Sequence, residues 1–301
     1  MATEFELKKQ FVEIGKRIWT RGYVASNDGN MTVKINDNEI LATPTGISKG
    51  YMTEDMIIKC DLDGNVISGN PKYRPSSEVK MHLDVYKERP DIKSVVHAHP
   101  PYATSFAVAG IPLDKCVLPE AIIVIGSVPI APYGLPSTME IPDRMRPFIK
   151  NSDAILLENH GALTLGSDLL NAYHKMETLE HTANIVWKSI QLGNVNIMPT
   201  EERDRLLSLR ERYNLTGKVA TCDTKPLYNN DQTINTNQFQ GAGTGYGSGS
   251  GLGTGVGTGA GAGLGNGVGD GTGPLLENAN NVSEQAIKEI VERVLGKLKN
   301  N

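Results

Sequence analysis

Apolar and polar positions alternate along the first two thirds of the chain with two different periods. Near the N-terminus, Phe5, Phe11, Ile14 and Ile18 recur at helical spacing among charged residues, which predicts an amphipathic helix within residues 1–22. Elsewhere, β-branched and apolar runs indicate strands. The whole pattern predicts further helices near 77–87, 101–109, 168–192 and 200–213, and strands near 31–35, 39–42, 93–98, 122–125 and 153–158. Such a mixture fits a layered α/β fold.

Beyond residue 217 this pattern stops. Residues 221–240 are polar, and from Gly241 to Gly273 every odd-numbered position is glycine. An extended chain of this kind could stack into a silk-like sheet, whereas a coil keeps the large conformational entropy of glycine. The residues between the glycines are mostly small, which favours the coil. We therefore expect one domain at 1–217 and a flexible linker at 218–274.

The last segment, 275–301, carries a second amphipathic pattern. Between Val282 and Leu298, one helical face is apolar and the other is charged, with Ser283 in the N-cap position. A single helix of this length is marginal in water and needs a surface to cover its apolar face. Docking on its own domain would not need a long linker, and the mixed charges suit a membrane surface less well. We expect this helix to dock on another protein. The apolar stripe comprises Ala286, Ile287, Ile290, Val291, Val294, Leu295 and Leu298.

Three histidines and a glutamate form the pattern with the most specific chemistry. His97 and His99 end a β-branched run, and the strand period of two puts both side chains on one face. His160 ends another apolar run, and Gly161 after it indicates a tight turn. Three imidazoles leave one position of Zn²⁺ open, as catalytic zinc sites do, and Glu78 is the candidate to fill it at rest. An isolated His-x-His pair is more often structural, so the hypothesis depends on all four residues. The other histidines lie on helix-like stretches without ligand spacing and are interpreted as structural: His82, His174 and His181.

Short runs of glycine, hydroxyl and amide groups stand beside expected turns or helix starts. Backbone N–H groups at such places, joined by hydroxyls, bind phosphate without much positive charge. Turns use the same residues, and a serine before a helix can simply be its N-cap, so these runs alone do not predict a phosphate site. The runs are Asp28-Gly29-Asn30, Thr43-Pro44-Thr45-Gly46 and Pro75-Ser76-Ser77.

Charge and cysteine content indicate which partners and which cellular compartment to expect. The net charge is −4, and Lys and Arg are scattered without aromatic interleaving, so we expect no nucleic-acid partner. Cys60, Cys116 and Cys222 are odd in number and widely spaced, which predicts free thiols in a reducing compartment. No apolar run resembles a signal peptide or a membrane span. We expect a cytoplasmic protein without a membrane partner.

Together, the motifs resemble the class II, zinc-dependent L-fuculose-1-phosphate aldolases and their relatives, among them the ribulose-5-phosphate 4-epimerases. The resemblance covers about residues 5–215. It implies a three-layer α/β/α fold around a mixed, largely antiparallel sheet, and a homotetramer with active sites at subunit contacts. The motifs that occur in the family's order and spacing are Gly29-Asn30, Thr43-Pro44-Thr45-Gly46-Ile47, Pro75-Ser76-Ser77-Glu78, His97-x-His99, Ala131-Pro132-Tyr133 and Asn159-His160-Gly161.

The resemblance also implies roles for individual residues. His97, His99 and His160 match the zinc ligands, with one ion per subunit. Glu78 matches an acid/base that also reaches the metal when no substrate is bound, a role that favours a pKa raised toward neutrality. Tyr213 matches a catalytic tyrosine in a mobile C-terminal arm that closes over the substrate. The phosphate-binding positions are matched by Gly29, Asn30, Thr45, Gly46, Ser76 and Ser77.

One position departs from the family. The proton-donating tyrosine of the fuculose enzyme aligns near Leu118, where this chain has no tyrosine. Glu120 is the only ionisable group close by. The identity of the proton donor therefore stays open, with Tyr213 as a candidate, and so does the substrate.

The resemblance implies zinc-dependent retro-aldol cleavage of a ketose 1-phosphate, either L-fuculose 1-phosphate or L-rhamnulose 1-phosphate, to dihydroxyacetone phosphate and L-lactaldehyde. One alternative is an L-ribulose-5-phosphate 4-epimerase, which recombines the fragments. Another is a non-catalytic scaffold, whose expected mark would be the loss of the zinc ligands that this chain keeps. The tail resembles the encapsulation peptides of bacterial microcompartments. We therefore expect residues 282–298 to bind a shell protein and the enzyme to be cargo in a microcompartment lumen, where the reactive aldehyde is confined.

Overall fold

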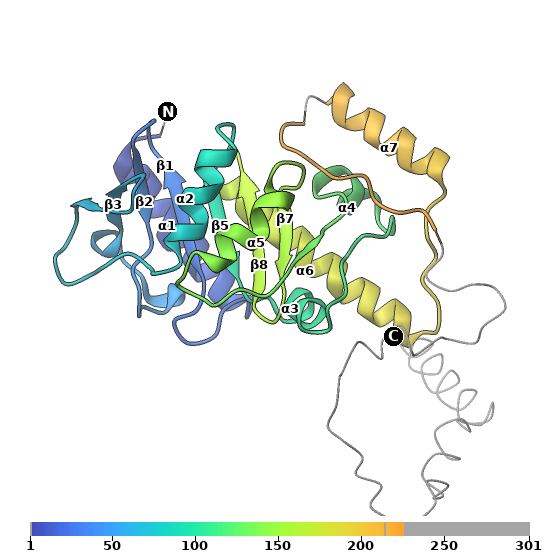
Figure 1. Ribbon diagram of the computed structural model, residues 1–301, viewed down its shortest axis with the longest axis horizontal. Coiled ribbons are helices and arrows are strands. Elements are labelled where there is room, and N and C mark those ends of the chain that lie inside the picture. The colour runs from blue at the N-terminus through green and yellow to red at the C-terminus, as the bar shows by residue number, and fades with distance from the viewer. Residues whose placement is uncertain (1, 214, 226–301) are drawn as a thin grey trace, which may run out of the picture. The chain divides into compact units, whose positions relative to one another are not determined.

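The computed structural model describes residues 2–213 and 215–225 (Figure 1). The strands within them are β1 (Asn30–Lys34), β2 (Glu39–Ala42), β3 (Ile58–Asp61), β4 (Val66–Ser68), β5 (Ser94–Ala98), β6 (Ile130–Ala131), β7 (Ala154–Leu157) and β8 (Gly161–Gly166). They form one sheet in the order β4-β3-β2-β1-β5-β8-β7-β6. Neighbouring strands are antiparallel except β6 and β7, which are parallel. The expected mixed, largely antiparallel sheet is confirmed.

Helices cover both faces of this sheet. They are α1 (Glu4–Thr20), α2 (Val79–Glu88), α3 (Pro101–Val108), α4 (Pro119–Val124), α5 (Glu140–Ile149), α6 (Leu169–Gln191) and α7 (Thr200–Arg212), with 3₁₀ turns η1 (Lys49–Tyr51) and η2 (Glu54–Met56). One hydrophobic cluster joins α1, α3, α4 and α6 to the sheet, and a second joins α2 and α5 to its other face. Successive strand residues alternate between them, since Val96 belongs to the first cluster and Val95 to the second. Helix, sheet and helix therefore form the three predicted layers.

Local signals fix where the first helix begins. The Thr3 hydroxyl accepts the Glu6 N–H at 3.3 Å, and the Glu6 carboxylate accepts the Thr3 N–H at 2.7 Å, which is a complete capping box. Phe11, Ile14 and Ile18 are buried at helical spacing. The amphipathic first helix is confirmed. None of the helices in the described ranges is both long and apolar enough to cross a membrane.

The predicted strand near 122–125 is wrong, because these residues form the end of α4 and its C-cap. Pro119 stands in the first turn, where its missing N–H leaves no hydrogen bond unmade. Ala121, Ile122 and Ile125 are buried at helical spacing, whereas a strand would bury alternate residues. This β-branched run therefore lies at the end of a helix. The prediction also lacked β3, β4, β6, β8 and α5.

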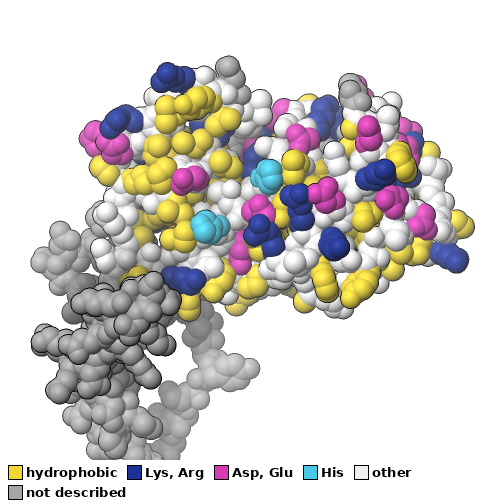
Figure 2. Space-filling view, turned by 180° about the vertical axis from the view of Figure 1, so that it is seen from behind, with side chains coloured by type: hydrophobic (Ala, Val, Ile, Leu, Met, Phe, Trp, Pro, Cys, Tyr) yellow, Lys and Arg dark blue, Asp and Glu magenta, His cyan; other side chains and the backbone are white. Residues whose placement is uncertain are grey.

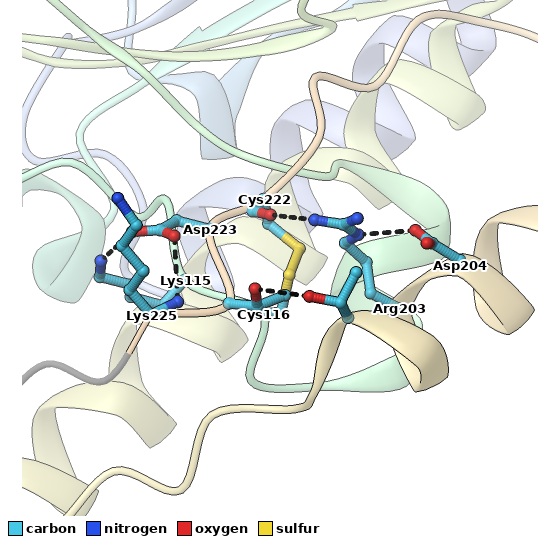
Figure 3. The surroundings of a disulfide bond; sticks show 9 residues. Lys115, Cys116, Arg203, Asp204, Cys222, Asp223 and Lys225 are labelled. Carbon is cyan, nitrogen blue, oxygen red and sulfur yellow. Dashed lines mark hydrogen bonds and ion pairs between the residues drawn. A yellow bond between two sulfur atoms is a disulfide. The ribbon is translucent and has the colours of Figure 1, made fainter.

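Residues 218–225 return to the domain instead of starting the linker, so the domain extends past the predicted boundary at 217. The Ser127 N–H donates to the carbonyl oxygen of Ala220 at 2.8 Å. Further along, Cys222 forms a disulfide with Cys116, with their Cα atoms 5.3 Å apart. Figure 3 shows this bond between the Lys115–Asp223 ion pair and Arg203. Residues 226–301, including the expected helix at 282–298, lie outside the described residues.

The prediction of three free thiols is therefore wrong for two of them. Cys116 and Cys222 are 106 residues apart in sequence, and only the fold brings them together. Cys60 alone remains a free, buried thiol among the described residues. Because the inference of a reducing compartment rested on unpaired cysteines, it loses its basis.

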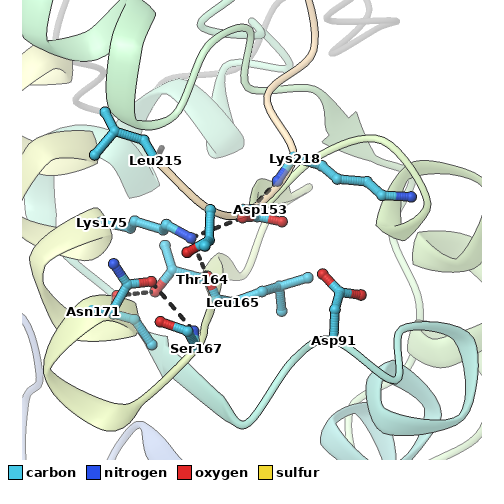
Figure 4. A network of polar contacts seen from close by, with 12 residues as sticks. Asp91, Asp153, Thr164, Leu165, Ser167, Asn171, Lys175, Leu215 and Lys218 are labelled. Carbon is cyan, nitrogen blue, oxygen red and sulfur yellow. Dashed lines mark hydrogen bonds and ion pairs between the residues drawn. The ribbon is translucent and has the colours of Figure 1, made fainter. Parts of the chain in front are cut away.

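Asp153, directly before β7, is the centre of a buried ion-pair network (Figure 4). Its carboxylate lies 2.8 Å from Arg89 Nη2 and 2.8 Å from Lys175 Nζ, and it accepts the Lys218 N–H at 2.9 Å. All three charged side chains are buried. The network thus joins the C-terminal end of α2, the N-terminal half of α6 and the returning segment 218–225 to the start of β7.

We expect Asp153→Asn to lower the free energy of unfolding by about 3–5 kcal/mol, because two buried cations lose their shared counter-charge. Denaturant unfolding of the wild type and the variant measures this difference. Asp63, whose side chain is 81% exposed, provides the control. Asp63→Asn should change the free energy of unfolding by less than about 0.5 kcal/mol. A similar small effect of both variants would contradict the role given to Asp153.

Candidate metal centre

The pairing of β5 places the histidines. His97 faces Asn30 of β1 on one side and Leu163 of β8 on the other. His99 follows the end of β5, two residues further and on the same face. His160 lies in the turn between β7 and β8. Because β8 runs antiparallel to β5, this turn stands at the end of β5, and the three histidines meet as the sequence predicts.

The ring nitrogens and one carboxylate converge. His97 Nε2 and His99 Nε2 lie 3.1 Å apart, and one ligand atom from each of the three histidines lies within 4.8 Å of the others. Glu78, directly before α2, adds its carboxylate: Oε1 is 3.2 Å from His160 Nε2, and Oε2 is 3.6 Å from His97 Nε2. Across the described ranges, no other group of three or more His, Cys, Asp or Glu residues has such geometry.

These distances fit a tetrahedral cation. With metal–ligand distances of about 2.0–2.1 Å, neighbouring ligand atoms around zinc lie about 3.4 Å apart. The three separations here are 3.1, 3.2 and 3.6 Å. His97 Nδ1 lies 2.9 Å from the carbonyl oxygen of Ala162 and donates its proton there, so that Nε2 presents a lone pair to the cluster. Burial lowers the pKa of His97 well below its ordinary value, which keeps the ring in the neutral form that binds metals.

Glu78 is ionised at neutral pH. Burial raises its pKa, but the hydrogen bond with His160 and the electrostatic interaction with the histidine cluster outweigh burial and lower the pKa to about 2. The expected shift toward neutrality is therefore wrong. Asn30 Nδ2 donates to Oε2 at 2.8 Å and helps to hold the carboxylate. An ionised carboxylate is the form that accepts a proton and binds a cation.

Gly161 is required by close packing rather than by the turn. A Cβ at this position would lie 2.5 Å from His99 Cδ2 and 2.6 Å from the carbonyl oxygen of Ala98. The left-handed backbone of the turn falls instead on Asn159, with φ of 54°. Gly161 therefore lets β8 approach β5 closely enough for His160 to reach the other two rings.

Two of the three glycine and hydroxyl runs lie side by side. The Thr45 N–H donates to the carbonyl oxygen of Arg74 at 2.9 Å, and the Ser76 N–H donates to the carbonyl oxygen of Thr43 at 3.3 Å. These bonds join segment 43–46 to segment 74–77. The Ser76 hydroxyl accepts the Glu78 N–H at 3.3 Å, which connects these segments to the histidines. The exposed residues of the two segments are Thr45, Gly46, Arg74 and Ser77. The Thr45 N–H is used between the segments, so the donors offered to an anion beside the metal centre are the Thr45 hydroxyl, the Gly46 N–H and the side chains of Arg74 and Ser77.

The third run adjoins the metal centre directly. Gly29 has φ of 72°, and a Cβ there would lie 2.9 Å from the carbonyl oxygen of His97. Asn30 is buried, and its amide donates to Glu78. Asn30 Oδ1 and His160 Nδ1 are buried without a hydrogen-bond partner among the described residues. Asn30 therefore contacts the candidate acid/base, in addition to its expected place near a phosphate.

Tyr213 is not brought to the histidines. It caps the C-terminus of α7 and is 65% exposed, and α7 packs against α4 (Figure 1). Leu118 caps the N-terminus of α4, and Glu120 lies in its first turn. Both line a cavity of about 830 Å³ whose wall includes Tyr23. The Tyr23 carbonyl oxygen accepts the His99 N–H at 2.9 Å, so one residue of the cavity wall contacts the backbone of a candidate metal ligand.

The remaining histidines lie apart from the cluster, as interpreted from the sequence. His82 is buried in α2, and its Nδ1 lies 2.9 Å from the Thr32 hydroxyl. Burial lowers the pKa of His82 to about 3, so this ring is a neutral core group. His174 and His181 are exposed on α6.

Two contacts in the centre escaped the sequence analysis. One is the Ala162 carbonyl oxygen, since a backbone acceptor leaves no signal in residue type. The other is Asp28, whose Oδ2 lies 3.4 Å from His99 Nδ1. Asp28 stands in a run interpreted as phosphate-binding, and its partner is distant in sequence, so only the fold reveals the pair.

One face of the molecule carries mixed charge. Figure 2 shows this face, on which acidic and basic side chains are interspersed. No broad region of a single sign covers it. This face therefore offers no broad basic surface to a large anion.

Comparisons with known proteins agree with this geometry. The model of the Class II Aldolase and Adducin N-terminal domain family matches residues 9–187. An L-fuculose phosphate aldolase of Methanococcus maripaludis is 37% identical over 176 residues, which are 58% of this chain and 93% of that protein. A 3-oxo-tetronate 4-phosphate decarboxylase of Haemophilus influenzae is 32% identical over 187 residues, 61% of this chain and 88% of that protein. A solved L-fuculose 1-phosphate aldolase superposes with a TM-score of 0.64 at 31% identity, covering 70% of this chain and 98% of that one.

We expect Gly161→Ala to weaken Zn²⁺ binding by about 10-fold or more, because the added methyl group must displace the His99 ring. Competition with a chromophoric chelator measures the affinity. Gly110→Ala is the control, since no atom lies within 4 Å of the added methyl group and the strain stays in a distant turn. Equal Zn²⁺ affinity of the Gly161→Ala variant and the wild type would show that His99 is not held by this contact.

Proposed function

The chain belongs to the class II aldolase family, and from this premise we propose that it cleaves the C3–C4 bond of a phosphorylated 2-ketose, the bond that joins the carbons α and β to the ketone. The proposed substrate is L-fuculose 1-phosphate or L-rhamnulose 1-phosphate, and the products are dihydroxyacetone phosphate and L-lactaldehyde. The observation that supports this most is the convergence of three imidazoles and the Glu78 carboxylate beside two donor-rich segments. The similarity to L-fuculose phosphate aldolases favours the same reaction.

The proposed cofactor is one Zn²⁺ per subunit. His97, His99 and His160 would hold it, with Glu78 as a further ligand at rest. When bound, the ion supplies a Lewis acid that draws charge from the ketone oxygen of the substrate. The neutral ring of His97 and the ionised carboxylate of Glu78 suit a divalent cation of this kind.

Proton transfer is assigned to Glu78 and a tyrosine. Cleavage leaves an electron pair on the carbon beside the ketone, and this carbon must gain a proton, while the hydroxyl that becomes the aldehyde must lose one. We assign the carbon end to Glu78, because its carboxylate adjoins the three histidines. Since Glu78 is ionised at rest, it must first accept the proton relayed from the substrate hydroxyl and then pass it to this carbon. The oxygen end is assigned to Tyr213 of a neighbouring subunit. This assignment agrees with the exposure of Tyr213 on α7 and with the expected homotetramer.

The phosphate group is assigned to the segments that adjoin Glu78. The Gly46 N–H and the hydroxyls of Thr45, Ser76 and Ser77 would bind its oxygens, and this would fix the distance from the phosphate to the reacting carbon. The Ser76 hydroxyl contacts the backbone of Glu78, so phosphate binding and the acid/base share one rigid turn. The proposed phosphate-binding residues are Gly29, Asn30, Thr45, Gly46, Ser76 and Ser77.

A second candidate is decarboxylation of a 3-oxo-tetronate 4-phosphate, and Leu118 favours it. Loss of CO₂ from such a β-keto acid leaves the same electron pair beside a ketone, but it releases no aldehyde. No group is then needed to remove a hydroxyl proton, so a leucine could stand where the fuculose enzyme has its tyrosine. The similarity to a decarboxylase of Haemophilus influenzae points the same way.

One assay distinguishes these reactions. The zinc-loaded protein is offered L-fuculose 1-phosphate, L-rhamnulose 1-phosphate, L-ribulose 5-phosphate and a 3-oxo-tetronate 4-phosphate. Dihydroxyacetone phosphate and CO₂ are measured separately, and light scattering of the same preparation tests the homotetramer. Dihydroxyacetone phosphate without CO₂, abolished by a chelator, is expected. Release of CO₂ would select the decarboxylase, and epimerised pentulose without cleavage would select the epimerase. No turnover of any substrate would contradict the proposed function.

Glu78→Gln is expected to lower kcat by about 10²–10⁴-fold, because the amide cannot carry the proton. Zn²⁺ should stay bound through the three histidines, as elemental analysis would show. Glu88→Gln, at the other end of α2, removes a carboxylate that pairs only with surface cations and should leave kcat unchanged. Full activity of the Glu78→Gln variant would remove Glu78 from the mechanism.

We also propose that residues 275–301 direct the enzyme into a bacterial microcompartment, with 282–298 bound to a shell protein. This rests on the sequence alone: an amphipathic pattern follows a glycine-rich segment that is suited to a linker. A product aldehyde that reacts with cell components would give such confinement a purpose. The localisation and the shell partner are thus proposals about the tail, independent of the metal centre.

In the full chain, the double substitution Ile290→Asp and Val294→Asp should abolish sedimentation of the enzyme with isolated microcompartments. Both changes place a charge on the expected apolar stripe, whereas the control Glu284→Gln alters only the polar face. Immunodetection in the pelleted shells measures the retained fraction. Equal retention of both variants would refute docking through the stripe.

A further inference from the structure

The two neighbouring histidines of the metal centre face each other through nitrogens that cannot both carry a proton. His97 uses its Nδ1–H for the carbonyl oxygen of Ala162 at 2.9 Å, so its Nε2 is an acceptor. His99 Nε2 stands 3.1 Å from that atom. If the His99 proton were on Nε2, it would point at the His97 lone pair and block the place of a cation. The proton of His99 must therefore be on Nδ1 for both rings to act as ligands.

Asp28 is the group that favours this tautomer. Its Oδ2 lies 3.4 Å from His99 Nδ1, within reach of a long N–H···O contact when the proton is on Nδ1. A deprotonated Nδ1 would instead set a lone pair against the negative carboxylate. The run 28–30 is otherwise suited to phosphate, and the Asp28 carboxylate would repel a phosphate group unless a nearby group balanced its charge. His99 is that group.

The loop that carries Asp28 is held firmly. Buried Lys49 donates through Nζ to the carbonyl oxygens of Asn27 at 2.9 Å and Ile47 at 2.7 Å, which ties this loop to η1 and to segment 43–47. The Asp28 N–H donates to the carbonyl oxygen of Ala25 at 2.9 Å. On the other side of Asp28, Gly29 packs against the His97 backbone with no room for a Cβ. The carboxylate is therefore presented to His99 by an ordered turn.

We propose that Asp28 is a positioning residue that orients His99 and fixes its tautomer for metal binding. The inference rests on the proposed function in one respect, namely that His97, His99 and His160 hold the cation. It adds that Asp28, which contacts the ring of His99, tunes the metal affinity of this site without binding the metal. Partners of this kind typically change metal affinity by about 10–100-fold.

The test is the Zn²⁺ affinity of the full-length protein, measured by competition with a chromophoric chelator. Asp28→Ala should lower the affinity by about 10–100-fold, and Asp28→Asn, which keeps the shape but loses the charge, should lower it less. Asp37→Asn is the control, because that side chain is 93% exposed and remote from the histidines, and it should leave the affinity unchanged. The denaturant midpoint of the chelator-treated protein should be equal in all four proteins, and the Co²⁺ absorption spectrum should change only in the Asp28 variants.

The outcomes separate this inference from the proposed function. If His99→Ala loses the metal while both Asp28 variants bind it like the wild type, the positioning role is overturned and the metal centre stands. If His99→Ala also keeps the wild-type affinity, His99 is no ligand and both fall. A fall in the chelator-treated midpoint of Asp28→Asn, with an unchanged Co²⁺ spectrum, would make Asp28 a structural residue and overturn the inference.

Discussion

The site depends on the pairing of β5 with β1 on one side and β8 on the other. This register sets His97 opposite Asn30 and brings the Ala162 carbonyl oxygen to Nδ1 of the His97 ring, the nitrogen that faces away from the cluster. Asn30 in turn holds Glu78, so one row of paired strands aligns a ligand, its supporting acceptor and the acid/base. A shift of one residue in β5 would turn His97 to the opposite face, since strand side chains alternate.

The rest of the fold keeps this register fixed. Both faces of the sheet are covered by helices, so the strands are buried on both sides and a slipped strand would expose or bury the wrong residues. At the far end of β7, the buried Asp153 joins α2, α6 and the returning segment 218–225. The Cys116–Cys222 disulfide holds that segment beside α4. The reactive groups lie at the strand ends, where loops leave space for a ligand.

The charge arrangement of the centre matches carbonyl chemistry. The neutral ring of His97 and the ionised carboxylate of Glu78 suit a divalent cation, and the donors in segments 43–46 and 74–77 suit an anion beside it. The two sites are connected through Ser76, whose hydroxyl accepts the Glu78 N–H. A phosphorylated ketone would then be bound at both ends, with the bond to be broken between fixed groups.

The sequence by itself determined those parts of the structure that follow from local periodicity. Period two placed His97 and His99 on one face, the apolar run before His160 is a strand, and the pattern around Phe11 forms the first helix. It did not determine features that depend on contacts between distant segments. Residues 122–125 became the end of a helix because α4 and its C-cap bury Ala121, Ile122 and Ile125 while the helix packs against α6 and α7, and Cys116 met Cys222 across 106 residues. The pKa of Glu78 fell because three imidazoles surround it, and Asp28 acquired a partner that its own neighbours do not reveal. Periodicity is a property of neighbouring residues, whereas electrostatics and packing at a site are set by whatever the fold brings within a few ångströms.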